Sequence, residues 1–187
     1  MRAAIWRVLQ RTLLGAGAAA LAYAGGSVVY GNVAQRAASR TFDRAAVADH
    51  VDLAEGDPVG RLEVPRIGLS VMVLQGVGEW ILTAGAGHVP GTPSPGGGGN
   101  VVIAAHRDTF FRKLEGVVRG DRIQMATARG RYQYVVESTE VVDPEDTQVM
   151  ESRARDELTL VTCYPFYYIG SAPKRFVVHA RPARDSG

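Results

Sequence analysis

From residue 59 onward, apolar residues recur mostly at every second position, in short runs that glycine and proline interrupt. Ile67, Leu69, Val71 and Val73 alternate in this way, and alternate side chains of a β-strand share one face. Further short runs cover residues 100–105, 121–126, 131–138, 157–162 and 175–180. Many short strands with little helical periodicity predict an all-β domain, a closed or nearly closed β-barrel with short helices.

The N-terminal part has a different pattern, because residues 12–35 contain no charged side chain. This stretch is long enough for the roughly 20 residues with which a helix crosses a bilayer. Arg2, Arg7 and Arg11 precede it, and the positive-inside rule places such arginines in the cytoplasm. We therefore predict one N-terminal transmembrane helix, with the rest of the chain on the extracytoplasmic side of the cell membrane.

A cleaved signal peptide is the alternative interpretation of the same segment. Ala22 and Ala24 flank Tyr23 in the small-x-small pattern of a cleavage site. The apolar stretch continues past that site through Val28 and Val29, which favours the uncleaved anchor. Both interpretations export the rest of the chain.

These patterns divide the chain into three parts. We predict a cytoplasmic N-terminus and signal anchor over residues 1–35, a stalk over 36–58 with a helix around 42–53, and the β-barrel domain over 59–183. The formal net charge is +2, and the first 40 residues contribute +5 from five arginines without an acid, which leaves −3 for the rest. A slightly acidic domain argues against nucleic-acid binding.

The candidate chemistry lies at the ends of three predicted strands. Cys163 follows one apolar run, His106 follows another, and Arg175 begins a third. Cys163 and Arg175 share one rim of the barrel if their strands are antiparallel neighbours. His106 reaches that rim if its strand runs parallel to the Cys163 strand. A thiol, an imidazole and a fixed cation together suit acyl transfer through a thioester.

Each of these residues also has a structural interpretation. A lone cysteine at a strand end is often a small buried apolar residue, and with one cysteine no internal disulfide can form. We expect His88 to lie in a glycine-rich loop and His179 to be an ordinary strand residue. The stretch 91–100 lacks the Lys-Ser/Thr of a phosphate-binding loop and is interpreted as a turn. Spacing alone leaves the catalytic and the structural interpretation both open.

Three sequence blocks resemble a known family. They are HRDTFF at residues 106–111, TLVTCYPFYYIG at 159–170 and APKRFVV at 172–178. Their order and content resemble the motif blocks of the sortases, most closely those of class D, over about residues 60–180. One departure is Ala105, where the family commonly has glycine.

The resemblance implies a sortase-type β-barrel and a membrane-anchored cysteine transpeptidase. Cys163 would be the nucleophile, His106 the general acid/base, and Arg175 the residue that clamps substrate or stabilises the oxyanion. Such enzymes cleave an LPXTG-type sorting signal between Thr and Gly and pass the acyl group to an amine on the cell surface. A pilin-polymerising sortase and a non-catalytic exported β-barrel binding module are the alternatives.

Three further residues receive roles from the same resemblance. Thr162 and Tyr164 flank the nucleophile and are expected to line the peptide groove, and Asp108 is expected to help fix the His106 loop. The acidic calcium-binding loop of some class A sortases has no convincing counterpart here, and no Cys/His set could close a zinc site. We therefore expect no metal and no cofactor.

Overall fold

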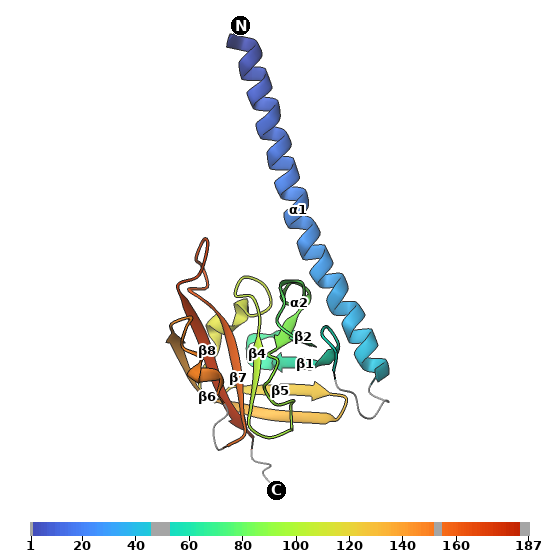
Figure 1. Cartoon of the computed structure of the whole chain (residues 1–187), viewed down its shortest axis with the longest axis vertical. Helices are drawn as coiled ribbons and strands as arrows, with labels where there is room; N and C mark the ends of the chain where they lie inside the picture. The colour runs from blue at the N-terminus through green and yellow to red at the C-terminus, as the bar shows by residue number, and fades with distance from the viewer. Residues whose placement is uncertain (1, 46–52, 152–154, 184–187) are drawn as a thin grey trace.

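The computed structural model describes residues 2–45, 53–151 and 155–183. A long helix, α1 (Arg2–Ala45), leads to a closed barrel whose strands follow the order β1-β2-β3-β4-β7-β8-β6-β5 (Figure 1). The strands are β1 (Pro58–Val64), β2 (Leu69–Gln75), β3 (Ala86–His88), β4 (Asn100–Ala104), β5 (Arg122–Thr127), β6 (Gly130–Val142), β7 (Glu157–Tyr164) and β8 (Lys174–Pro182). The short helices are η1 (Pro65–Ile67), α2 (Glu79–Ala84), η2 (Arg112–Gly116) and η3 (Thr147–Met150). The prediction of a closed barrel with short helices is confirmed.

Local sequence accounts for the first hairpin of the barrel. Pro65 has no N–H to donate to a strand ladder, and β1 ends just before it. Gly68 follows η1 with φ 61°, in the left-handed region that favours glycine, and β2 then pairs antiparallel with β1. The alternation predicted on both sides of Pro65 therefore becomes two paired strands.

Strand alternation also determines which side chains fill the barrel. Val101, Ile103, Leu158 and Leu160 are buried in the main core cluster, together with Val178 on β8. Burying each large aliphatic side chain contributes about 1.5–3 kcal/mol. The residues between them on β4, β7 and β8 face the opposite side of the sheet. This outer face carries the candidate site.

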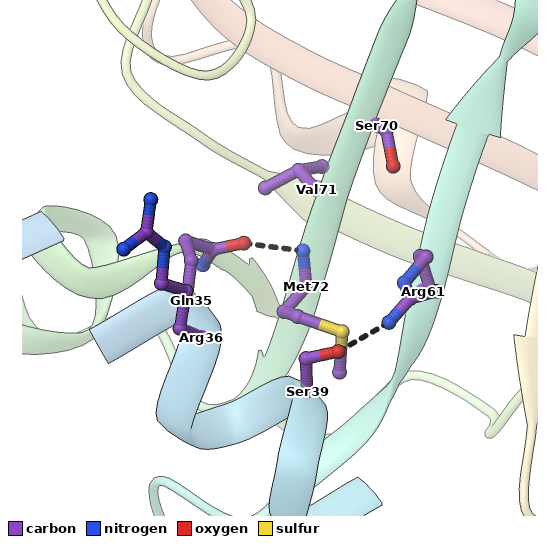
Figure 2. Close-up of a pocket in the computed structure, with 7 residues that line it drawn as sticks. All are labelled: Gln35, Arg36, Ser39, Arg61, Ser70, Val71 and Met72. Carbon is purple, nitrogen blue, oxygen red and sulfur yellow. Dashed lines mark hydrogen bonds between the residues drawn. The ribbon is translucent and has the colours of Figure 1, made fainter. Parts of the chain in front are cut away.

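The C-terminal part of α1 docks on the barrel through polar contacts (Figure 2). The Gln35 side chain accepts a hydrogen bond from the Met72 backbone N–H at 2.7 Å and donates one to the Ala84 carbonyl. Arg61 on β1 donates to the Ser39 hydroxyl one turn further along the helix. The helix thus contacts β1, β2 and the end of α2 with the same face.

Close approach of α1 depends on small residues. Ala34 and Ala38 pack against a second buried cluster of Leu74, Ile81 and Ala84. A Cβ atom on Gly85 would lie 2.5 Å from Gln35 Nε2 and 2.6 Å from the Met72 carbonyl oxygen. Glycine is therefore required where Gln35 passes the barrel.

α1 passes through the boundary predicted between residues 35 and 36. It runs unbroken to Ala45, so the first part of the predicted stalk is helical. The rest of the predicted 42–53 helix, including His50, lies largely in residues 46–52, outside the described residues. Within the described residues, none of the helices combines the length and the hydropathy needed for a bilayer crossing.

Candidate active site

Cys163 and Arg175 face each other across two neighbouring strands. β7 and β8 are antiparallel, and their register pairs Cys163 directly with Arg175. The loop over residues 165–173 joins the two strands just beyond this pair and projects from the barrel on the side to which the N-terminal end of α1 points (Figure 1). The predicted rim therefore exists, and Cys163 and Arg175 are cross-strand neighbours on it.

His106 reaches the same level from the other side of β7. β4 runs parallel to β7, with Ala104 paired to Val161. The Ala105 N–H continues the ladder by donating to the Val161 carbonyl at 3.3 Å. Two residues further along each chain, His106 is level with Cys163.

Strand alternation places two of the three side chains on one face of the sheet. Phe176 packs against the barrel core, so the alternation of successive strand residues puts Arg175 and its partner Cys163 on the outer face. His106 directly follows the core residue Ala105, just beyond the end of β4. All three residues are half-buried, so each is partly accessible.

The surroundings of Arg175 fix the direction of its guanidinium. Its Nη1 donates to the carbonyl oxygens of Ala172 at 3.3 Å and Lys174 at 3.0 Å. The Lys174 ammonium pairs with Asp143 at 2.7 Å, which ties the start of β8 to the segment after β6. A fixed guanidinium beside a thiol can stabilise negative charge that develops on a carbonyl oxygen.

Thr162 connects the two strands that carry His106 and Cys163. It is 3% exposed, and its hydroxyl donates to the Ala105 carbonyl at 2.7 Å. Ala105 directly precedes His106, so this bond holds the end of β4 against β7. A direct contact between Thr162 and substrate stays a prediction.

Tyr164 and Asp108 lie at different depths. The Tyr164 ring stacks on Phe176 with centroids 6.3 Å apart and meets Phe166 edge-on at 5.9 Å. Phe166 belongs to the main core cluster, and the rings of Tyr164 and Phe176 pack against that cluster. Asp108 is exposed, two residues after His106. The substrate and loop-fixing roles of these two residues also stay predictions.

The segment after His106 is anchored by groups that sequence reasoning did not single out. Phe111 is fully buried, and its N–H donates to the His106 carbonyl at 3.0 Å. Arg107 donates to the carbonyls of Tyr168 and Gly170 in the β7–β8 loop, and Arg112 lies 3.9 Å from the centroid of the Tyr167 ring. The sequence does offer one signal for this contact of Phe111: it is an aromatic residue that comes shortly after a polar turn.

His88 occupies a position other than the expected loop. It ends the short strand β3 and is 3% exposed, with Nδ1 2.8 Å from Gln75 Oε1 and Nε2 2.9 Å from the Pro93 carbonyl. Burial lowers the pKa of its imidazole, while the hydrogen bond to Pro93 acts in the opposite direction. His88 thus fastens the glycine-rich loop to the barrel.

His179 is a strand residue, as expected, and it lies between two carboxylates. Its Nδ1 is 2.8 Å from Glu157 Oε1, and its Nε2 is 2.8 Å from Glu140 Oε1. Glu157 is 1% exposed and His179 4%. Among the described residues, no three His, Cys, Asp or Glu side chains form a group suited to a metal ion.

The family model of the sortase domain matches residues 62–183, which include Cys163, His106 and Arg175. The chain belongs to the sortase family. This sortase is 34% identical over 127 residues to Sortase D of Bacillus subtilis (strain 168), covering 67% of this chain and 64% of that protein. It is 30% identical over 149 residues to Sortase A of Bacillus anthracis, covering 73% and 69% of the two chains.

Solved structures agree with this assignment. A Clostridium perfringens Sortase D5 transpeptidase superposes with a TM-score of 0.74 at 23% identity, over 81% of this chain and 99% of that one. Sortase C1 of GBS Pilus Island 1 gives a TM-score of 0.64 at 25% identity, over 83% and 84%. The prediction of a sortase most similar to class D is confirmed. The matched region spans less than two-thirds of the Bacillus subtilis relative.

Proposed function

We propose that this sortase is a membrane-anchored cysteine transpeptidase. It cleaves an LPXTG-type sorting signal between Thr and Gly and transfers the new acyl group to an amine on the cell surface. The observation that supports the proposal is the strand register: Cys163 pairs with Arg175, and Ala104 and Val161, which pair with each other, lie two residues before His106 and Cys163. Similarity to relatives that are named as sortases supports the reaction class.

The first half-reaction follows from these three groups. The Cys163 thiolate attacks the carbonyl carbon of the substrate Thr, and the carbonyl oxygen gains negative charge beside the Arg175 guanidinium. The carbon–nitrogen bond to Gly then breaks, and protonated His106 gives its proton to the departing amine. The products are a thioester on Cys163, a neutral His106 and a peptide with a new N-terminus.

The second half-reaction reverses these roles. An acceptor amine attacks the thioester carbon and passes a proton to neutral His106. The carbon–sulfur bond breaks, and Cys163 leaves as a thiolate. The acyl group is now joined to the acceptor by an amide bond, and the site returns to its starting protonation state. Water in place of the amine would give hydrolysis.

The outer face next to Cys163 suits an extended peptide. Ala104 and Val161 are paired, half-buried and small or β-branched, so they offer a shallow apolar surface. The segment between β6 and β7 borders this surface, because the Asn100 side chain donates to the carbonyls of Val149 and Glu151 at 3.4 and 3.2 Å. Apolar side chains of the sorting signal would rest on Ala104 and Val161 while its Thr carbonyl lies at Cys163.

The membrane anchor in this proposal is the uncharged part of α1, with Arg2, Arg7 and Arg11 on the cytoplasmic side. The β7–β8 loop and the N-terminal end of α1 point to the same side of the barrel (Figure 1). Anchoring through α1 would therefore bring the active end of the barrel towards the membrane surface. A carbonate wash of membranes from cells expressing the full chain tests this part: an anchored chain stays in the pellet, and a cleaved, soluble one does not.

A pilin lysine is the alternative acceptor, supported by the similarity to Sortase C1 of GBS Pilus Island 1. Intact mass spectrometry tests the central step, with the full chain in detergent, an LPXTG-type peptide and Cys163→Ala as control. We expect an adduct of the peptide acylated through its Thr, absent from the control. Adding candidate amines then identifies the acceptor. A thiol that resists both the peptide and an alkylating reagent would instead favour the non-catalytic binding module.

A further inference from the structure

We propose that Arg107 is a positioning residue that holds His106 level with Cys163. It does so by fastening the segment after β4 to the loop between β7 and β8. Arg107 directly follows His106, and the loop joins the strands of Cys163 and Arg175. The proposal rests on the proposed function, because positioning matters only if His106 exchanges protons with the reacting groups.

The contacts of Arg107 are directed at backbone atoms of the loop. Its Nη2 donates to the Tyr168 carbonyl at 2.7 Å and to the Gly170 carbonyl at 2.9 Å. Gly170 has a φ of 95° and open space where a Cβ would lie, so its glycine serves the backbone conformation. This turn brings two carbonyls, two residues apart, to one guanidinium nitrogen.

An aromatic contact adds to these hydrogen bonds. The Arg107 guanidinium carbon lies 5.8 Å from the centroid of the Tyr168 ring, within the range of a cation–π interaction. A planar guanidinium can stack on a ring and donate from its edge at the same time, which an ammonium cannot. Lysine would therefore replace only part of this contact.

The segment that carries His106 depends on such a link. β4 ends at Ala104, and the strand ladder to β7 extends only to the Ala105 N–H. His106 is therefore placed by its neighbours: Thr162 holds Ala105 from one side, and Phe111 binds the His106 carbonyl. Within this segment, the Arg107 side chain forms the hydrogen bonds to the β7–β8 loop. It thereby links His106 to β7 and β8, the strands that carry Cys163 and Arg175.

Arg112 provides a matched control. It comes from the same segment and stacks on Tyr167, the residue next to Tyr168, at 3.9 Å. Both arginines thus contact the same loop through a tyrosine ring. The two hydrogen bonds to loop carbonyls distinguish Arg107. Removing Arg112 should weaken loop packing without releasing the His106 segment.

The experiment compares Arg107→Ala, Arg107→Lys and Arg112→Ala with the unchanged full chain in detergent. Transpeptidation of an LPXTG-type peptide onto an amine gives kcat and KM across a range of pH. We expect Arg107→Ala to lower kcat by about 10- to 100-fold through misplacement of the general acid/base, with KM within about threefold. Arg107→Lys should recover part of the loss, and Arg112→Ala should stay within about threefold.

A second measurement needs no substrate. NMR spectra of the histidine rings at one fixed pH should show that Arg107→Ala moves the His106 ring resonances and leaves those of buried His179 in place. A rise in KM with unchanged kcat would make Arg107 a substrate contact and overturn the proposal. Equal losses for Arg107→Ala and Arg112→Ala, or unmoved His106 ring resonances, would also overturn it. If the unchanged chain forms no thioester, the proposed function fails, and the ring resonances still report the effect of Arg107 on His106.

Discussion

Cys163 and Arg175 are cross-strand partners on β7 and β8, and both are half-buried on the outer face of the barrel. Directly opposite residues in an antiparallel pair have Cβ atoms about 4.5–5.5 Å apart. Strand register therefore places the two residues side by side, while the Arg175 guanidinium itself donates to the carbonyls of Ala172 and Lys174. Changing the Arg175 side chain should alter catalysis while the strand pairing persists.

We expect Arg175→Ala to lower kcat for transpeptidation by about 100- to 1,000-fold, the usual effect of removing an oxyanion-stabilising donor. Arg175→Lys should retain part of the rate, because it keeps the charge but loses the planar donor. Steady-state kinetics check this, with circular dichroism to confirm folding. Arg181→Ala is the control, since Arg181 lies on β8 and is exposed. Full activity in a folded Arg175→Ala chain would remove Arg175 from the mechanism.

Thr162→Val should lower both stability and activity. The buried Ala105 carbonyl accepts a hydrogen bond from the Thr162 hydroxyl at 2.7 Å. Valine has no hydroxyl, so the substitution leaves that carbonyl without this donor. An unmade buried hydrogen bond costs about 1–3 kcal/mol in the free energy of unfolding, measured here by urea denaturation. Thr162→Ser keeps the hydroxyl and should be milder. If Thr162→Val is as stable as Thr162→Ser, the bond contributes little to joining β4 and β7.

His179→Ala should destabilise the fold strongly. Both ring nitrogens lie 2.8 Å from carboxylate oxygens, and Glu157 is almost fully buried. Removing the imidazole takes a buried hydrogen-bond partner from Glu157, and an unmade buried hydrogen bond costs about 1–3 kcal/mol, to which the cavity left by the ring adds. The exposed pair of Lys174 and Asp143 is the control, and Lys174→Ala should cost less than about 1 kcal/mol. Equal urea midpoints for the two variants would contradict this account.

The stability of the barrel should fall in acid partly because of His88. Burial lowers the pKa of the folded imidazole, so the unfolded chain binds the proton first. The contribution of neutral His88 to the free energy of unfolding is fully present above the pKa of about 6.5 in the unfolded chain. It is lost as the pH falls towards the lower pKa in the folded chain. One proton changes the unfolding free energy by at most about 1.4 kcal/mol per pH unit.

His88→Gln tests this, with urea unfolding at several pH values between 5 and 8. The variant should show a shallower loss of stability below pH 6.5 than the unchanged chain, because glutamine does not titrate. An identical slope in both chains would assign the acid sensitivity to other groups.

Much of the barrel follows from local sequence. Alternation predicted the strands on either side of Pro65, and the short apolar runs predicted β4, β7 and β8. Both patterns can be recognised locally, because a strand's burial determines which of its neighbouring residues are apolar. β3 has only three residues, too few to show a period, and so His88 was expected in a loop. β6 extends to Val142, beyond the predicted 138, because its exposed second half pairs with β8.

The residues of the candidate site were named from strand ends and motif blocks, and their chemistry depends only on residue type. Whether they meet depends on the parallel pairing of β4 with β7 and the register of β7 with β8, which join segments far apart in the chain. The inward side chain of Thr162 and the bonds from Arg107 to loop carbonyls were also beyond the sequence. Backbone carbonyls are the same in every residue, so only the folded chain decides which of them a side chain reaches.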